Sequence, residues 1–167
     1  VDYPGWPAGY TWALNGLMGA AFDGLYHWMF PALGTWVIGI NTEDGTMRGH
    51  DSATWPASIV LGTDHRFFSG IHTEKNSLWL IPAMADSLVH LDSITGVATG
   101  YNNWPAGFTA TSHRFQGGIW DGQYIWLGPR NGHSMIIRFD TLTGAMEDYS
   151  RLYPRTFISS GINFIGM

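Results

Sequence analysis

The chain has 167 residues, no cysteine and a formal net charge of −5, which excludes a disulfide framework, thiolate catalysis and cysteine-ligated zinc. The acidic balance and the absence of any Lys or Arg run argue against nucleic-acid binding. Only 13% of the residues are charged, 15% are aromatic, and no apolar run approaches the roughly 18 residues of a membrane span, so an all-β repeat protein without membrane insertion is expected.

A repeat of 49 residues organises the chain. An aromatic residue followed by proline recurs at equal steps, at Trp6-Pro7, Trp55-Pro56, Trp104-Pro105 and Tyr153-Pro154. Each copy also has a tryptophan three residues before a later proline and a glycine-containing turn that begins with Asn or Asp, at 41–45, 92–96 and 140–144. A period between about 20 and 50 residues indicates a solenoid, a propeller or an array.

Each copy predicts four short strands, rich in β-branched or aromatic residues and bounded by Gly, Pro, Asn or Asp. No segment has a helical period of useful length. In chain order the predicted strands are 18–22, 25–30, 35–40 and 46–50, then 67–72, 77–81, 87–91 and 97–101, then 115–120, 124–128, 135–139 and 145–149.

Four antiparallel strands per repeat form the blade of a β-propeller, so we expect an all-β propeller in one repeat domain, residues 1–167. Its Gly-rich first strands would line the central channel. Three full blades cannot close a ring of about four to eight, and open strand edges are normally avoided. We therefore expect the ring to be completed by other copies of the chain, or the chain to belong to a longer propeller. The predicted segments are 1–3 (end of a preceding blade), 4–51, 52–101 and 102–150 (full blades), and 151–167 (first strand of a further blade).

The third copy reads F-x-G-G-x-W-D-G-x-Y-x-W-x-x-P over 115–129, followed by a D-x-x-T-G turn. This pattern resembles the propeller repeats of uncharacterised bacterial and phage proteins. The stretch 88–96 is similar to YVTN and PQQ-type repeats, and Gly117-Gly118 is distantly similar to kelch, although the spacing departs from a kelch blade. The resemblance implies a binding or assembly module, often part of a virion or cell surface, and hence an extracellular or virion-associated location.

One face of the predicted propeller gathers the candidate binding residues. The loop before the first strand carries a His-Arg pair in the second and third copies, and it shares a face with the loop between the second and third strands. Aromatic platforms beside planar hydrogen-bonding groups suit sugars. The candidate ligand-binding residues are Trp55, His65, Arg66, Trp104, His113, Arg114, Arg130, Asn131 and His133.

A structural interpretation of these residues stays open, in which the Trp-Pro pairs pack between blades and the His-Arg pairs bridge neighbouring blades. Metal binding would need several histidines at one point, and the spacing provides none, so neither a metal nor another cofactor is expected. Four aspartates stand in repeat-locked turns and are expected to cap them: Asp23, Asp92, Asp121 and Asp140. The mid-strand tryptophans are expected in the core: Trp28, Trp79 and Trp126.

The leading functional hypothesis is a non-enzymatic, lectin-like module of a phage tail or cell-surface protein that binds a surface glycan. A purely structural or assembly domain is the alternative. A polysaccharide hydrolase or lyase with its site in the channel is the third, without support from a carboxylate pair, a nucleophile elbow or a phosphate-binding glycine loop.

Overall fold

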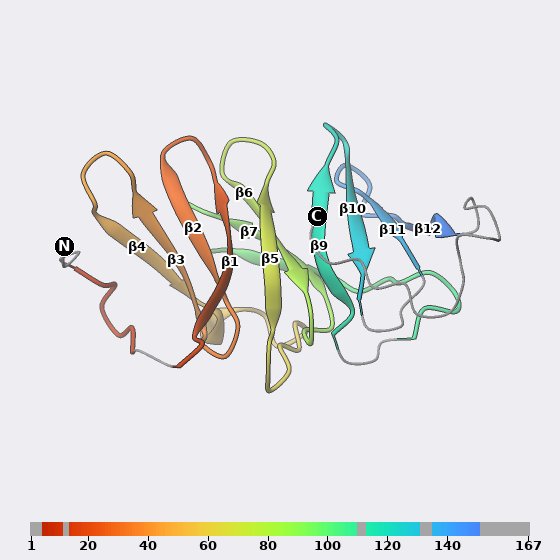
Figure 1. Ribbon diagram of the computed structural model, residues 1–167, viewed down its shortest axis with the longest axis horizontal. Helices are drawn as coiled ribbons and strands as arrows, with labels where there is room; N and C mark the ends of the chain where they lie inside the picture. The colour runs from red at the N-terminus through yellow and green to blue at the C-terminus, as the bar shows by residue number, and fades with distance from the viewer. Residues whose placement is uncertain (1–4, 12–13, 110–112, 131–134, 151–167) are drawn as a thin grey trace.

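The computed structural model consists of three four-stranded antiparallel sheets that stand side by side (Figure 1). The structure describes residues 5–11, 14–109, 113–130 and 135–150. Within these ranges there is no α-helix, and a short 3-10 turn, Ser52–Thr54, follows the first sheet. The predicted first strand within 157–167 and the blade end at 1–3 lie outside the described residues.

In each sheet the strands follow one another in sequence order, as in a propeller blade. Every predicted strand is confirmed to within two residues at either end. Sheet 1 contains β1 (Leu17–Phe22), β2 (Tyr26–Pro31), β3 (Trp36–Asn41) and β4 (Met47–Asp51); sheet 2 contains β5 (Phe67–His72), β6 (Ser77–Pro82), β7 (Leu88–Asp92) and β8 (Ala98–Tyr101); sheet 3 contains β9 (Phe115–Trp120), β10 (Tyr124–Pro129), β11 (Ile137–Asp140) and β12 (Met146–Asp148).

The turn aspartates have the predicted capping role. The Asp92 carboxylate accepts from the backbone N–H groups of Ile94 and Thr95 at 2.9 and 2.8 Å, and Gly96 supplies the left-handed backbone, with φ of 75°. In the Asp-Gly hairpin of sheet 3, Asp121 also accepts from the indole N–H of Trp126 at 2.7 Å. The Asp-Gly hairpins of sheets 1 and 3 therefore fix both their own backbone and the tryptophan of the following strand.

The innermost strands β1, β5 and β9 lie side by side and fix how closely the sheets approach (Figure 1). Gly19 sits at a bulge in β1 with φ of 66°, and a Cβ there would overlap the backbone of Phe68 and Ser69 in β5. At Gly70, a Cβ would overlap the buried ring of Phe30 in sheet 1. The glycine-rich first strands are thus required by close approach between sheets.

Two hydrophobic clusters fill the spaces between the sheets. Trp28, fully buried, belongs to the cluster between sheets 1 and 2, and Trp79, 4% exposed, belongs to the cluster between sheets 2 and 3. The prediction that Trp126 is also a core residue was wrong, because its ring is only half-buried. It lies on the outer face of sheet 3, where no further described sheet covers it.

An aromatic residue near the end of the fourth strand joins each sheet to the next. His50 stacks on Trp28 with ring centroids 6.0 Å apart, and its Nε2 lies 2.9 Å from the carbonyl oxygen of Ser93 in the turn of sheet 2. Tyr101 occupies the equivalent place against the turn of sheet 3, where a Cβ on Gly144 would lie 3.1 Å from its ring. The same contact is thus made at both interfaces.

Candidate functional site

The arginines of the His-Arg pairs tie neighbouring sheets together at the ends opposite the hairpins. Arg114 donates to the carbonyl oxygens of Met84 and Ala85, and Arg66 donates in the same way to the loop 33–34 of sheet 1. Arg114 is only 8% exposed, and this burial lowers the pKa of its guanidinium. Both guanidinium groups are therefore engaged in holding the fold, as the structural interpretation expects.

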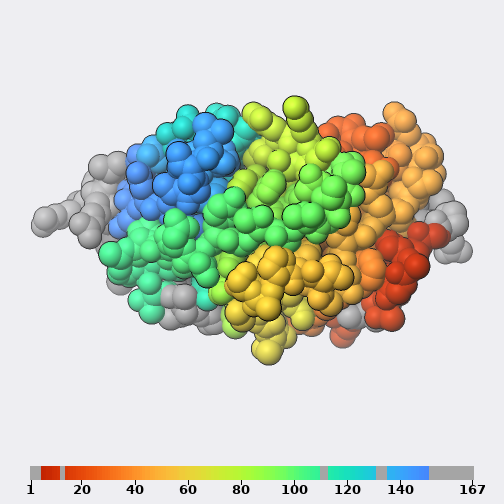
Figure 2. Space-filling view, turned by 180° about the vertical axis from the view of Figure 1, so that it is seen from behind, coloured from red at the N-terminus to blue at the C-terminus, as the bar shows by residue number. Residues whose placement is uncertain are grey.

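The tryptophans of the Trp-Pro pairs also pack inside the molecule. Trp55 is 8% exposed and meets Phe67 edge-on at 6.3 Å. The connecting segment that carries it forms a continuous yellow area at the lower middle of the molecule (Figure 2). Trp104 is half-buried, donates from its indole nitrogen to the carbonyl oxygen of Asp86 at 2.9 Å, and packs on Phe115 at 5.5 Å. These rings offer little surface to a ligand.

The structure does bring three of the predicted loop residues together. The rings of His65 and His113 lie 5.6 Å apart, and Phe68 stacks on His113 at 5.5 Å. The guanidinium of Arg130 lies 4.3 Å above the Phe68 ring, and His65 Nδ1 lies 2.5 Å from the Asp64 carboxylate. We call this group the histidine cluster. The remaining candidates, Asn131 and His133, lie outside the described residues.

Both histidines of the cluster project from a left-handed backbone. Their φ values are 40° and 57°, and the equivalent position in sheet 1, Asn15, has φ of 55°. Asn and His are among the residues that tolerate this conformation. Burial, with the positive charge of Arg130, lowers the pKa of His113, so its imidazole is neutral at neutral pH.

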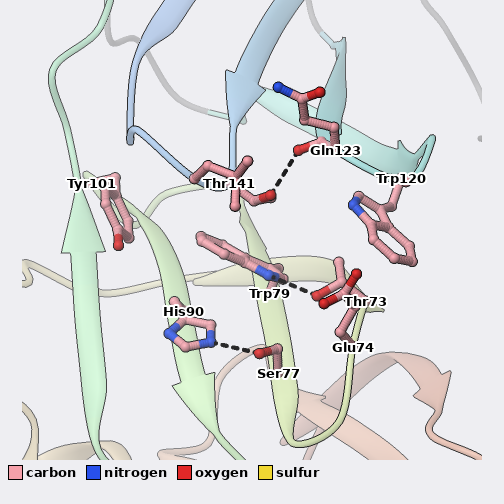
Figure 3. Close-up of a pocket in the computed structure, with 11 residues that line it drawn as sticks. Thr73, Glu74, Ser77, Trp79, His90, Tyr101, Trp120, Gln123 and Thr141 are labelled. Atoms are coloured by element: carbon pink, nitrogen blue, oxygen red, sulfur yellow. Dashed lines mark hydrogen bonds between the residues drawn. The ribbon is translucent and has the colours of Figure 1, made fainter.

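A hollow of about 430 Å³ opens on the opposite, hairpin face, between sheets 2 and 3 (Figure 3). Rings and polar side chains alternate around it, which is the composition of a small-ligand site. Sheet 2 supplies Thr73, Glu74, Ser77, Trp79, His90 and Tyr101, and sheet 3 supplies Trp120, Gly122, Gln123, Thr141 and Leu142. We call it the inter-sheet hollow.

The hollow exists because sheet 2 departs from the repeat. Ser77 pairs with the first residue of its turn, as Tyr26 and Tyr124 do in the other two sheets. Tyr26 packs beside its sheet's tryptophan at 5.6 Å between ring centroids, whereas serine leaves that volume empty. The hairpin of sheet 2 also runs through Thr73 and Glu74, where the other sheets have the shorter Asp-Gly turn.

Hydrogen bonds hold the floor of the hollow in place (Figure 3). The indole nitrogen of Trp79 donates to the Thr73 hydroxyl at 3.2 Å, and Nε2 of His90 lies 3.1 Å from the Ser77 hydroxyl. The His90 ring packs on Trp79 at 4.7 Å between centroids. Trp120 differs, since its indole N–H is buried and has no hydrogen-bond partner within the described residues. It is an unsatisfied buried donor in the wall of the hollow.

Acidification is expected to destabilise the protein through His90. Burial lowers the pKa of His90 below the usual histidine value of about 6.5, against an opposing effect of Asp92. Below about pH 6.5 the unfolded chain therefore binds a proton at His90 that the folded protein does not bind. The free energy of unfolding then decreases as the pH is lowered, by at most about 1.4 kcal/mol per pH unit from this group. Urea unfolding of wild type and His90→Gln between pH 7.5 and 5.5 tests this. The variant should lose less stability than wild type over that range, and equal losses would contradict the assignment.

The sequence pattern did not reveal the hollow. Residues that recur at equal spacing, such as Arg66 and Arg114, recur because they hold the sheets together, so a search for recurring residues finds structural positions. The hollow is instead indicated by a departure from the repeat. The second copy has Ser77 where the other copies have tyrosine, and a longer hairpin precedes it. Within the described ranges no group of three or more His, Asp or Glu side chains is placed to hold a metal ion. In the same part of the chain, no helix has the length and apolarity needed to span a membrane.

Comparison with known proteins supports a propeller-like fold. No protein-family model matches the chain, and no curated protein sequence matches it either. Among solved structures it is similar to a streptogramin B lyase, with a TM-score of 0.59 and 16% identity over 81% of this chain and 40% of that chain. The extracellular domain of the one-component system BT4673 from B. thetaiotaomicron gives a TM-score of 0.59 and 13% identity over 86% of this chain and 18% of that chain.

A third similar structure is a catalytically inactive histidine-to-alanine variant of virginiamycin B lyase from Staphylococcus aureus with quinupristin. Its TM-score is 0.57 and its identity 15%, over 81% of this chain and 41% of that chain. The neighbours are propeller proteins of the YVTN and virginiamycin B lyase type, consistent with the resemblance in the repeats. The chain spans less than half of each of these proteins, and identities this low establish the fold alone.

Proposed function

We propose that this chain is a non-enzymatic, carbohydrate-binding module of a cell-surface or phage-tail protein, and that the sugar binds in the inter-sheet hollow. The observation that carries the proposal is the hollow's composition: rings from Trp79, Tyr101 and Trp120 surround hydroxyl, carboxylate and imidazole groups in one concave space. Sugars present an apolar face to aromatic rings and hydroxyls to polar groups, so they match this alternation.

The hollow suits this role better than the loop face predicted from the sequence. Trp55 and Trp104 are packed inside the fold, and Arg66 and Arg114 are bonded to backbone carbonyls. By contrast, Trp120 is only half-buried and keeps an unpaired N–H. The proposal therefore keeps the ligand class expected from the sequence and places it on the other face.

Trp120→Ala should weaken sugar binding at least about tenfold, because it removes one stacking ring and one hydrogen-bond donor. Binding is measured by titration calorimetry with oligosaccharides first selected on a glycan array. Phe22→Ala is the matched control, because Phe22 ends β1 as Trp120 ends β9 and is 55% exposed. Unchanged affinity in Trp120→Ala would reject the hollow. Absence of any array binding would favour a purely structural domain.

A second candidate function is a lyase that acts at the histidine cluster. A histidine abstracts a proton only as the neutral imidazole, a form that the lowered pKa of His113 favours, and His65 lies beside it. One similar structure is a virginiamycin B lyase inactivated by loss of a histidine. Turnover of a polysaccharide or of quinupristin by wild type, lost in His113→Ala, would favour this candidate over the binding module.

We also propose that a second copy of the chain covers the outer faces of sheets 1 and 3. Ile40 is half-exposed, whereas its equivalents Leu91 and Phe139 are fully buried between sheets. On the other outer face, Trp126 is half-exposed although its equivalents lie in the core. The outer face of sheet 3 and the outer face of sheet 1 thus correspond to the two sides of the sheet-to-sheet interface that occurs twice within the chain. A second copy could pair them, because three sheets alone do not close a ring.

Light scattering should therefore give a native mass of a discrete multiple of the 18.5 kDa chain mass. Trp126→Glu should reduce the mass to that of one chain, because it places a charge in the new interface. Ile94→Glu is the control and should leave the mass unchanged, because Ile94 is 56% exposed in the turn of the middle sheet, away from both outer faces. A wild-type monomer would show that the missing blades come from elsewhere.

A further inference from the structure

Among the residues that line the inter-sheet hollow, Glu74 alone carries a full charge at neutral pH. The other titratable side chains there are Tyr101 and His90, and burial lowers the pKa of His90, which keeps its ring neutral. No Lys or Arg lines the hollow. The nearest cation in sequence, Lys75, stands on the same hairpin but outside the lining. The site therefore has negative potential and no positive partner.

Acidic groups from the neighbouring elements strengthen this potential. Asp92 ends β7 beside His90, Asp140 precedes the lining residue Thr141, and Asp121 lies between Trp120 and Gly122. The pKa of each of these aspartates is lowered, led by hydrogen bonds from turn N–H groups and, for Asp121, from an indole N–H, so all three are charged at neutral pH. A negatively charged ligand would therefore meet the Glu74 carboxylate inside the hollow and further negative charge on the turns around it.

Two groups that line the hollow have unused hydrogen-bonding capacity, the Glu74 carboxylate and the Trp120 indole N–H. The Glu74 carboxylate is exposed and has no partner among the described residues, and a carboxylate only accepts. The Thr73 hydroxyl accepts from Trp79, and Ser77 is bonded to His90. Glu74 therefore needs ligand O–H or N–H groups, and the Trp120 N–H needs one acceptor. A neutral sugar hydroxyl supplies both functions, whereas a sugar carboxylate supplies acceptors only.

We propose that the inter-sheet hollow selects uncharged, hydroxyl-rich sugars and rejects sugars that carry a carboxylate, and that Glu74 enforces the choice. This inference rests on the proposed carbohydrate-binding function. Like charges held within several ångströms at a protein surface repel strongly enough to weaken binding about tenfold. Because the hollow is open to solvent, salt reduces the discrimination.

Matched probes isolate charge from shape. The probes are trisaccharides of glucuronate, galacturonate and mannuronate, each as the free acid and as the methyl ester, together with the neutral glucose, galactose and mannose trisaccharides. Calorimetry at pH 7.5 and low salt measures each pair with wild type, Glu74→Gln and Glu43→Gln. Glu43 lies in the exposed turn of sheet 1, so its variant makes the same change in net charge away from the hollow.

Wild type should bind at least one ester or neutral sugar, and its free acid about tenfold more weakly. Glu74→Gln should reduce that difference to about threefold or less, while Glu43→Gln preserves it. Equal binding of acid and ester by wild type, or an undiminished difference in Glu74→Gln, overturns the selectivity and leaves the carbohydrate-binding function standing. If no neutral or esterified sugar binds, the proposed function itself fails and the selectivity fails with it.

Discussion

Gly19→Ala should destabilise the protein by about 3 kcal/mol or more, the largest effect expected from a single methyl group in this chain. The added Cβ would overlap the carbonyl oxygen of Phe68 and would lie 2.7 Å from the Cα of Ser69, both backbone atoms of the neighbouring sheet. Backbone cannot rotate away as a side chain can, so the two innermost strands must separate, which costs about 1–3 kcal/mol. The left-handed φ of 66° adds about 1–3 kcal/mol for a residue with a Cβ.

A second glycine separates these two contributions. Gly24 has φ of 99°, but a Cβ there meets nothing within 4 Å. Gly24→Ala therefore reports the backbone cost alone and should destabilise by about 1–2 kcal/mol. Chemical unfolding of both variants at pH 7.5 gives the comparison. If Gly19→Ala costs no more than Gly24→Ala, the contact between β1 and β5 is looser than the structure shows.

The fold could be predicted from the sequence because the repeat determines it locally. The Trp-Pro spacing sets the blade length, and a turn asparagine or aspartate with its glycine closes each outer hairpin by hydrogen bonds within a few residues. Strand positions follow from such local contacts. Trp126 was wrongly assigned to the core because burial depends on a neighbouring sheet. A sequence pattern specifies which face of a strand is apolar, but it does not show whether another sheet covers that face.

The candidate site could be predicted only in part. His65, His113 and Arg130 do lie together around Phe68, since equivalent loops of adjacent blades meet at one face. The hollow depends instead on a missing ring at Ser77 and on which side chains of the next sheet face that space. Such an absence has meaning only once the register of β6 against β7 is known, because it is the register that makes Ser77 the counterpart of Tyr26.

The second large effect is expected at Arg114, where the guanidinium bridges sheets 2 and 3. It donates to the carbonyl oxygens of Met84 and Ala85, and Ala85 is fully buried. Arg114→Met keeps much of the side-chain volume but leaves these carbonyls without their donor. Hydrogen bonds to charged groups contribute about 1.5–3 kcal/mol each, and an unsatisfied buried acceptor costs about 1–3 kcal/mol. Relief of guanidinium desolvation opposes this loss.

The balance favours a net destabilisation of about 3 kcal/mol in Arg114→Met, measured by urea unfolding. Arg66→Met is the matched control, because Arg66 makes the same pair of contacts with loop 33–34 but is more exposed. Water can replace its hydrogen bonds, so about 1 kcal/mol is expected there. If the two variants lose equal stability, burial does not govern the strength of the clamp. If Arg114→Met is as stable as wild type, the desolvation cost of the guanidinium cancels the gain from its hydrogen bonds. The role of Arg114 would then be ligand binding at the adjacent histidine cluster.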